Sequence, residues 1–390
     1  MPIDAMKIVH LVLGDRFNDG WLYQHNLLAL QNRLDGHEVS IITGCNSYST
    51  NAGKEGECPA GRYVDSNGIT VIRMARPKLV PPFLHYYKIR YYSALPNILE
   101  GENPDIVFLH GIQTFSLIPL SKYAKKHPNV RFYADNHADD FNVSKSFVGR
   151  RILHGVVYAR LYKLFGGFIS KLFYVTPERR DFLVSVYGLD EKKNKMEFLP
   201  LGGISYSDEK YAEIRKSERE KLGLQDSDVA FVHSGKLEPR KRTLDDIKAF
   251  IDADAPNAKL FLAGSITDSI RGEFEKLVAS SDKVEYLGWK TPDELNNLLC
   301  GCDVLLQTGS QSVIFEQGIC FGMAAILDRA DNNKFLLSDG NGIFADNHDE
   351  TVSAIRKLSS SPAMLAEMKQ KSKAFSKREL LYSSLVKKFY

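Results

Sequence analysis

The sequence contains no apolar run that reaches the roughly 18 to 20 residues of a membrane-spanning helix. Its first stretch, residues 1–15, has one lysine and an apolar run of about seven residues that ends at Gly14 and Asp15. This pattern predicts a first β-strand and not a signal peptide. We therefore expect a chain without a leader and without a transmembrane helix.

Cysteine is also scarce, and its count of five is odd. Cys300 and Cys302 stand close together, but no second pair follows at the spacing of a zinc site. The sequence thus predicts no disulfide framework and no metal site. A reduced chain of this kind is typical of the cytoplasm.

Charge of one sign is not in excess either, because 51 Lys and Arg balance 48 Asp and Glu to a net charge of +3. This balance argues against nucleic acid as the partner. The glycine fingerprint of dinucleotide-binding domains, G-x-G-x-x-G, does not follow the first strand. What remains is the composition of an ordinary soluble protein, and 390 residues suit two domains.

The first half of the chain alternates strands with helices. A strand at 7–13 precedes a loop, 14–20, that ends in Gly20, and a helix follows with Leu22, Leu27, Leu30 and Leu34 expected on one side. The next strand is predicted at 39–43, and residues 44–68 are predicted to form a long loop. Such a β-α-β unit places its loop at the carboxyl edge of a parallel sheet, where doubly wound folds bind ligands.

Two further apolar strands of the first half end in histidine. Residues 105–111 contain His110, and residues 131–137 end in Asn136 and His137. Because the carboxyl ends of parallel strands share one edge, both histidines are expected to face the ligand. Neither has the neighbouring ligands of a metal site.

Two segments combine cations with large apolar side chains. Residues 73–92 could rest on an anionic bilayer surface, or could form a lid whose aromatic side chains pack inward. Residues 145–172 have apolar residues at helical spacing, and there an ordinary amphipathic helix with a solvated basic face is favoured over a membrane-surface helix.

The second half restarts the strand and helix alternation after Pro200–Gly203. Its first strand, 229–233, leads into residues 235–242, which hold four cations and enter a helix. Another strand, 304–307, opens into the polar loop 308–312, after which a helix is predicted from about Val313 with Glu316 in its first turn. Together these loops favour a diphosphate site, because cations and a strand-to-helix turn both attract phosphate.

With these motifs the chain resembles family 4 of the retaining, nucleotide-sugar-dependent glycosyltransferases, which have the GT-B fold. The resemblance extends over nearly the whole length. It rests on Gly20, the step Gly36–Val39, the pair Asp105 and His110, the basic motif Gly235–Arg242, Glu316, the turn within 328–342, and the last segment, 375–390. The chain departs from the family at Thr308, where the family has the first of two glutamates, and at Lys236, where it has arginine.

The resemblance implies two Rossmann-like α/β domains that face each other across a crevice. Residues 1–202 would bind the acceptor, residues 203–374 the nucleotide sugar, and a helix within 375–390 would pack back on the first domain. Lys236 and Lys241 would hold the donor diphosphate, Glu316 the ribose, and His110 the sugar or the acceptor. The other expected donor contacts are Gly20, Gly235, Arg240, Thr308, Gly309, Ser310, Gln311, Ser312 and Val313, with Asn136 and His137 lining the sugar or acceptor.

The implied reaction moves a sugar from a UDP- or GDP-sugar to a glycan or lipid-linked acceptor with retention of configuration. The leaving diphosphate takes the acceptor proton, so neither a protein base nor a metal cofactor is required. The resemblance places this reaction in cell-surface polysaccharide or glycoconjugate synthesis, in the cytoplasm or at the inner face of the membrane through 73–92. Two alternatives stay open: a catalytically silent GT-B subunit that binds a glycan or protein, and a sugar-nucleotide epimerase.

Overall fold

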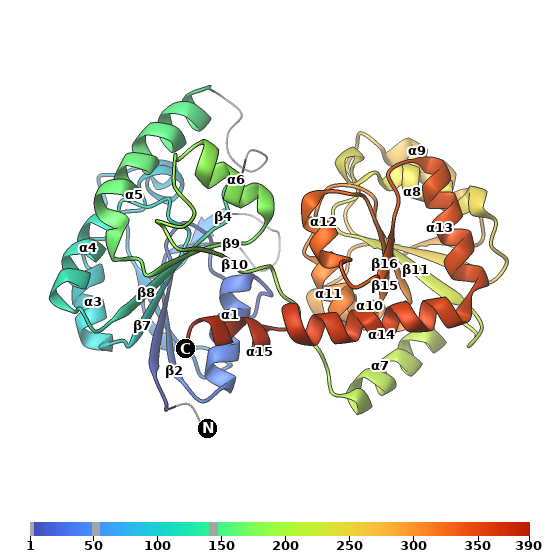
Figure 1. The fold of residues 1–390 in the computed structure, drawn as a ribbon, viewed down its shortest axis with the longest axis horizontal. Helices are drawn as coiled ribbons and strands as arrows, with labels where there is room; N and C mark the ends of the chain where they lie inside the picture. Colours follow the sequence, from blue (N-terminus) through green and yellow to red (C-terminus); the bar gives the residue numbers. More distant parts are fainter. Residues whose placement is uncertain (1–3, 49–54, 140–146) are drawn as a thin grey trace. The chain divides into compact units, whose positions relative to one another are not determined.

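The computed structural model describes residues 4–48, 55–139 and 147–390. The chain divides into two compact units, which are visible in Figure 1. Unit 1 comprises Met1–Pro200 together with Val386–Tyr390, and unit 2 comprises Leu201–Leu385. Each unit contains its own sheet with helices on both faces. The predicted fold, two doubly wound α/β domains, is thereby confirmed.

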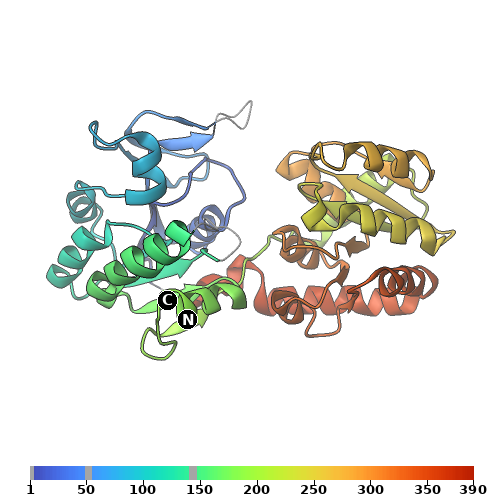
Figure 2. The ribbon, with the colours of Figure 1, turned by 90° about the horizontal axis from the view of Figure 1, so that it is seen from above.

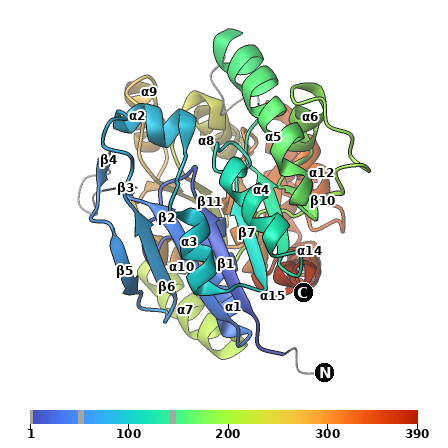
Figure 3. The same cartoon turned by 90° about the vertical axis from the view of Figure 1, so that its left-hand side faces the viewer.

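The sheet of unit 1 has eight strands in the order β10-β9-β8-β7-β1-β2-β6-β5. All neighbours are parallel except β5, which runs antiparallel to β6. Figure 3 shows β5, β6, β2, β1 and β7 following one another across the sheet. The strands are β1 (Lys7–Val12), β2 (Glu38–Gly44), β5 (Gly61–Val64), β6 (Thr70–Met74), β7 (Ile106–His110), β8 (Arg131–Asn136), β9 (Lys171–Tyr174) and β10 (Met196–Phe198), and a separate hairpin is formed by β3 (Asn46–Tyr48) and β4 (Glu55–Glu57).

Helices cover both faces of this sheet because its central strands are apolar on both sides. On β1, Val9 and Leu11 join the larger core, whereas Val12 joins a smaller core that includes Ala29 of the first helix. Each fully buried side chain of this size contributes about 1.5–3 kcal/mol to folding. The helices of unit 1 are α1 (Gln24–Leu34), α2 (Pro82–Leu84), η1 (His85–Ile89), α3 (Leu95–Glu102), α4 (Leu117–Lys126), η2 (Val148–Tyr158), α5 (Ala159–Phe165), η3 (Gly166–Phe168), α6 (Pro177–Ser185) and η5 (Val386–Lys388).

Two local predictions for unit 1 are wrong. Apart from 49–54, which lie outside the described residues, the segment 44–68 is not one long loop, since it contains β3, β4 and β5. These strands are short and polar, so they lack the apolar alternation that would reveal them. Of the predicted apolar face of α1, Leu27 is buried but Leu34 is 70% exposed, and Leu28 and Asn32 are buried as well. The inward face of the helix is therefore partly polar.

The sheet of unit 2 has six parallel strands in the order β13-β12-β11-β14-β15-β16. The strands are β11 (Val229–Ser234), β12 (Ala258–Ala263), β13 (Val284–Tyr286), β14 (Val304–Leu306), β15 (Ala324–Leu327) and β16 (Gly342–Phe344). The helices are α7 (Asp208–Lys221), η4 (Pro239–Lys241), α8 (Thr243–Ala253), α9 (Arg271–Ala279), α10 (Pro292–Gly301), α11 (Ile314–Cys320), α12 (Asp331–Leu336), α13 (His348–Ser360), α14 (Pro362–Glu379) and α15 (Tyr382–Leu385).

Alternate residues of β11 pack into the two hydrophobic cores of unit 2. Phe231 packs with the side chains of α8, α9 and α13, whereas Ala230 and Val232 pack with those of α10, α11 and α14. In Figure 2 the yellow helices of this unit are seen on the opposite side from the red helix α14. The carboxyl ends of the central strands are thus held between two packed layers.

The chain returns to unit 1 at its last residues, as the predicted C-terminal crossing requires. In η5 the Nζ of Lys388 donates to the carbonyl of Phe198, and the ring of Phe389 lies 4.8 Å from that of Phe108. Among the described residues, no helix has both the length and the apolar character needed to cross a bilayer.

Candidate functional site

The basic motif of unit 2 follows directly after β11. Gly235 has φ of +117°, and Gly264, which follows β12, has φ of +144°. A Cβ atom on Gly264 would lie 1.7 Å from the carbonyl oxygen of Gly235. The two strand ends therefore approach each other so closely that a side chain at position 264 would collide with the backbone.

Lys241 joins the basic motif to the polar loop after β14. Its Nζ donates to the carbonyl of Ser310 at 2.6 Å and to the carbonyl of Gln311. Burial lowers the pKa of this lysine to about 8, although Glu238 and Glu316 favour its charged form. The ammonium thus serves first as the anchor of the loop.

Gly309 brings the same two segments together through the backbone. A Cβ atom at this position would lie 2.3 Å from the carbonyl carbon of Lys241. The amide of Ser310 also donates to the carbonyl of Arg240 at 2.9 Å. The sequence prediction that residues 235–242 and 308–312 lie side by side at one sheet edge therefore agrees with the structure.

Thr308 is fully buried and bonded within the protein. Its hydroxyl donates to Oδ1 of Asp246 at 2.6 Å, and its amide donates to Oδ2 of the same carboxylate at 3.1 Å. Nδ1 of His233 lies 3.1 Å from that Oδ2. The hydroxyl that was expected to contact the donor sugar is therefore engaged with Asp246.

The other residues expected to bind the donor lie around this loop. Glu316 is 1% exposed in α11, and Gln311 donates to its Oε1 at 3.3 Å. A Cβ atom on Gly235 would lie 3.6 Å from the hydroxyl of Ser312. Val313 is exposed at the start of α11, a helix of only seven residues with a correspondingly small dipole.

The remaining cations of the motif differ in exposure. The side chain of Lys236 is 64% exposed and pairs with Glu238 at 3.3 Å. Arg240 is exposed as well. Arg242, whose φ is +52°, donates to the carbonyls of Thr308 and Asp346. Lys236 and Arg240 are therefore the cations of this motif that can reorient toward a ligand.

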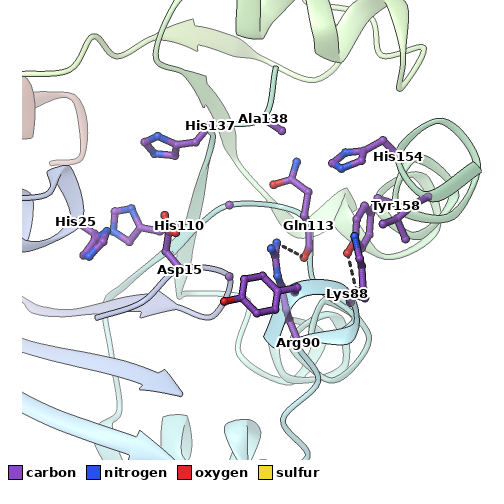
Figure 4. Close-up of a pocket in the computed structure, with 14 residues that line it drawn as sticks. Asp15, His25, Lys88, Arg90, His110, Gln113, His137, Ala138, His154 and Tyr158 are labelled. Atoms are coloured by element: carbon purple, nitrogen blue, oxygen red, sulfur yellow. Dashed lines mark hydrogen bonds between the residues drawn. The ribbon is translucent and has the colours of Figure 1, made fainter. Parts of the chain in front are cut away.

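Unit 1 has a cavity of about 360 Å³, shown in Figure 4. His110 and His137, the two histidines singled out in the sequence, both line it. Figure 4 shows His25 close to His110 on one side of the cavity. The other lining residues are Gly14, Asp15, Tyr87, Lys88, Arg90, Gly111, Gln113, Ala138, Leu153, His154 and Tyr158.

Asp135, at the end of β8, holds the two histidines together. Its Oδ2 lies 2.8 Å from Nδ1 of His110 and 3.2 Å from Nε2 of His137, and its Oδ1 accepts from the amide of Gly111 at 2.8 Å. Burial alone would raise the pKa of Asp135, but His137 and His110 lower it well below its ordinary value. In return Asp135 raises the pKa of His137, although burial opposes this.

The two histidines differ in what they present to a ligand. Nε2 of His110 lies 3.0 Å from Nδ1 of His10, so both of its ring nitrogens face protein atoms. The side chain of His137 is 35% exposed. The imidazole that is open to the cavity is thus that of His137.

Two predicted residues do not line this cavity. Asn136 is buried, where it accepts from Gln113 and donates to the carbonyls of Ala138 and Arg179. Gly20, with φ of +73°, is exposed in its loop. Gln113 and Asp135 were missed, although Asp135 stands next to Asn136 and could have been noticed from its place at the strand end.

No group of three or more His, Cys, Asp or Glu side chains in the described ranges is arranged to hold a metal ion. The five cysteines are free thiols, four of them buried.

Comparison with solved structures shows the same fold along nearly the whole chain. Sucrose-phosphate synthase from Thermosynechococcus elongatus is similar with a TM-score of 0.66 at 13% identity, over 98% of this chain and 97% of that one. HepE from Anabaena, in complex with UDP, gives 0.66 at 14% identity, and WaaG, a glycosyltransferase involved in lipopolysaccharide biosynthesis, gives 0.59 at 17%, each over 98% of both chains. No curated protein sequence matches the chain significantly.

The two doubly wound units and this similarity along nearly the whole chain define the GT-B fold. The sequence model described as Glycosyltransferase Family 4 matches residues 23–202. Over this segment the chain is similar to glycosyltransferase family 4, and over nearly its whole length it has the fold of the solved structures named above. The family resemblance predicted from the sequence is confirmed.

Proposed function

We propose that unit 2 binds the nucleotide sugar where residues 235–242 meet the loop 308–313. The observation that carries this proposal is the double junction of these segments through Lys241 and Gly309. It gathers ammonium and guanidinium groups at the carboxyl ends of β11 and β14, and ligands of α/β sheets bind at such ends. Glu316, buried beside this loop, would accept hydrogen bonds from the ribose.

The proposed chemistry stabilises negative charge that develops on the donor diphosphate. Lys241 has three N–H donors, of which two bond loop carbonyls, so one remains for a phosphate oxygen. Lys236 and Arg240 are exposed and would close on the diphosphate from outside. A preorganised cation such as Lys241 contributes about 2 to 4 kcal/mol to transition-state stabilisation.

Unit 1 would bind the acceptor in the cavity beside His110 and His137. Accordingly we propose residues 1–202 as the acceptor domain, residues 203–374 as the donor domain and 375–390 as the connection back. His137 would donate a hydrogen bond to a sugar hydroxyl, because its ring is partly exposed and Asp135 favours its protonated form. The acceptor proton would pass to the leaving diphosphate, which makes a strong protein base unnecessary.

The acceptor we propose is a glycan or a lipid-linked glycan at the surface of a membrane. Within 73–92 the side chains of Leu79 and Phe83 are 98% and 66% exposed, whereas His85, Tyr86 and Tyr92 pack inward. The inward packing agrees with the lid alternative, and the exposed pair supports the membrane alternative that we propose. Lys78 is exposed beside the apolar pair and would face anionic head groups.

The helical segment 148–165 adds a second surface of the same kind. Phe147 and Leu164 are 72% and 74% exposed, and Arg151, Arg160 and Lys163 are exposed among them. The hydroxyl of Tyr158 donates to the carbonyl of Lys88 at 2.6 Å, so this segment touches η1. Residues of both segments line the cavity, which supports an acceptor that reaches it from a bilayer.

For the donor we propose a UDP- or GDP-sugar, in the synthesis of a cell-surface polysaccharide or glycoconjugate. HepE, which shares the fold, has been solved with UDP and with UDP-glucose, and WaaG acts in lipopolysaccharide biosynthesis. These two proteins support a sugar nucleotide as the donor. We propose that the chain acts in the cytoplasm or at the inner face of the membrane.

Thermal unfolding with a panel of nucleotide sugars tests the proposal. A donor that binds the folded state increases the free energy of unfolding by mass action, by about 2.7 kcal/mol at a hundred times its Kd. The melting temperature rises as a result. We expect one UDP- or GDP-sugar to stabilise the chain more than its nucleoside monophosphate, because the diphosphate meets the basic motif. Equal melting temperatures with every donor of the panel would contradict the proposal.

A further inference from the structure

A series of hydrogen bonds runs from the surface of unit 1 into its interior. It begins at Asp35, whose Oδ2 accepts from the hydroxyl of Tyr390 at 2.8 Å. That hydroxyl accepts from Nδ2 of Asn32 at 2.9 Å. Oδ1 of Asn32 in turn lies 2.9 Å from Nε2 of His10, and both residues are fully buried.

The series continues from His10 to the cavity. Nδ1 of His10 lies 3.0 Å from Nε2 of His110, and Nδ1 of His110 lies 2.8 Å from Oδ2 of Asp135. The rings of the two histidines are stacked with an interplanar angle of 10°. An unbroken row of hydrogen bonds thus connects an exposed carboxylate, Asp35, with a buried one, Asp135.

The two carboxylates at the ends of this row determine the direction in which its hydrogen bonds donate. An ionised carboxylate only accepts hydrogen bonds, so the row must donate outward at both ends. A tyrosine hydroxyl has one proton, and the asparagine here uses its oxygen on one side and its nitrogen on the other. Neither can donate in both directions. The member that does so must be a histidine with both ring nitrogens protonated.

We propose that Asn32 and Tyr390 are positioning residues that hold one shared proton, and with it one positive charge, on the His10–His110 pair beside the cavity. The role of that charge in acceptor binding rests on the proposed function, whereas the protonation itself does not.

The pair contacts the carboxylate of Asp135 through His110. Burial and the neighbouring His110 lower the pKa of His10 to about 3. Three further titratable groups bear on the pair: His25 from α1, whose ring lies 5.8 Å from that of His110, and Asp135 and His137 from β8. Of these only Asp135 favours the charged pair.

In this arrangement His110 and His137 have different roles in the cavity. Because both N–H groups of His110 are used within the protein, His110 acts on a ligand through its charge and not as a hydrogen-bond donor. The donor is then His137. The row from Asp35 holds that charge on the His10–His110 pair.

Nuclear magnetic resonance of the full chain with ¹⁵N-labelled histidine tests the proposal without any assay of activity. Two-bond ¹H–¹⁵N correlations distinguish protonated from unprotonated ring nitrogens, and the variants His10→Gln and His110→Gln assign the two rings. We expect one ring of the pair to carry both protons at pH 7. In Tyr390→Phe the row loses its outer acceptor, so the pair should release its proton at least about one pH unit lower.

Two variants keep this test decisive. Asp35→Asn changes the exposed end of the row, where the substitution should not disturb folding. It should lower the same pH midpoint, because an amide can donate to Tyr390 and reverse the direction of the hydrogen bonds. Tyr123→Phe removes a buried hydroxyl of the same unit that donates to the carbonyl of Leu99, away from the row, and should leave the midpoint unchanged. Two neutral rings at pH 7, or an unchanged midpoint in both Tyr390→Phe and Asp35→Asn, would overturn the proposal. Failure to transfer sugar with the expected spectra would overturn only the proposed function.

Discussion

Lys241 combines a structural role in the loop with a proposed role in binding the diphosphate. Its ammonium is buried against the carbonyls of Ser310 and Gln311, yet it is also the cation that the family resemblance assigns to the diphosphate. A charge held in this way costs little to reorganise when negative charge develops next to it. Removing it should therefore loosen the loop and weaken the site together.

The lowered pKa of Lys241 predicts opposite pH dependences for binding and for folding. Nucleotide affinity should fall as pH rises through about 8, where the ammonium loses its proton. Between that pH and the ordinary lysine value of about 10.4, the unfolded chain binds more protons than the folded one, so the contribution of Lys241 to the unfolding free energy rises with pH. Calorimetry of UDP binding and urea unfolding over pH 7 to 10 measure both.

Lys241→Met should remove both slopes. Lys248→Met is a matched control, since Lys248 lies on α8 of the same unit and pairs with Glu273 at the surface. Affinity that is flat across pH 8 in the unchanged chain would contradict this account of Lys241.

Thr308 stands where the family has a glutamate, and the structure gives a reason why a glutamate does not fit. Asp246 already receives the hydroxyl and the amide of residue 308 in a fully buried space. Thr308→Glu would bring a second carboxylate against it, and we expect a loss of at least about 3 kcal/mol in unfolding free energy, without a gain in activity. Chemical denaturation gives this value directly.

Thr308→Ser, which keeps the hydroxyl, should stay within about 1 kcal/mol of the unchanged chain. A stable and more active Thr308→Glu variant would show that the buried network is not what excludes the acid.

At the scale of elements, the two apolar and basic segments of unit 1 lead to a prediction about membranes. Phe83→Glu and Ile152→Glu place a negative charge on the exposed faces of α2 and η2, so both should reduce binding to vesicles that contain anionic lipid. Sedimentation of the protein with such vesicles, at low and at high salt, measures the effect. We expect at least about a fivefold loss of binding, which is about 1 kcal/mol.

Leu34→Glu serves as the control, because Leu34 is 70% exposed on α1, outside both segments. Equal vesicle binding by Leu34→Glu and Phe83→Glu would contradict a specific membrane surface.

The elements that the sequence revealed are those with a strong local pattern. Each central strand of the two sheets is a short apolar run, and β1, β7 and β11 were found within one or two residues of their observed ends. The strands β4 and β5 were missed because Glu55–Glu57 and Gly61–Val64 are polar edge segments that depend on hydrogen bonds to a neighbour.

The candidate site divides in the same way. Lys241 and His110 stand in recognisable motifs at strand ends, so the sequence could single them out. His10 and Asn32 could not be found, because their meaning arises only when His10 meets His110, a hundred positions away, and Asn32 meets Tyr390. Contacts of such long range leave no trace in local spacing.

At the scale of the whole molecule, the chain has the GT-B fold, with one α/β unit for each proposed substrate. We propose above all that the basic motif of unit 2 drives cleavage of a nucleotide sugar. That claim concerns turnover, which binding experiments alone do not test.

The most direct measurement is the release of nucleoside diphosphate from the nucleotide sugar that stabilises the chain most. We predict turnover by the unchanged protein and a loss of kcat/KM of about thirtyfold or more in Lys241→Ala, which corresponds to about 2 kcal/mol of transition-state stabilisation. Lys248→Ala, on the same unit, should turn over the donor at the original rate. No release from any donor, or equal rates in Lys241→Ala and the unchanged protein, would contradict the account.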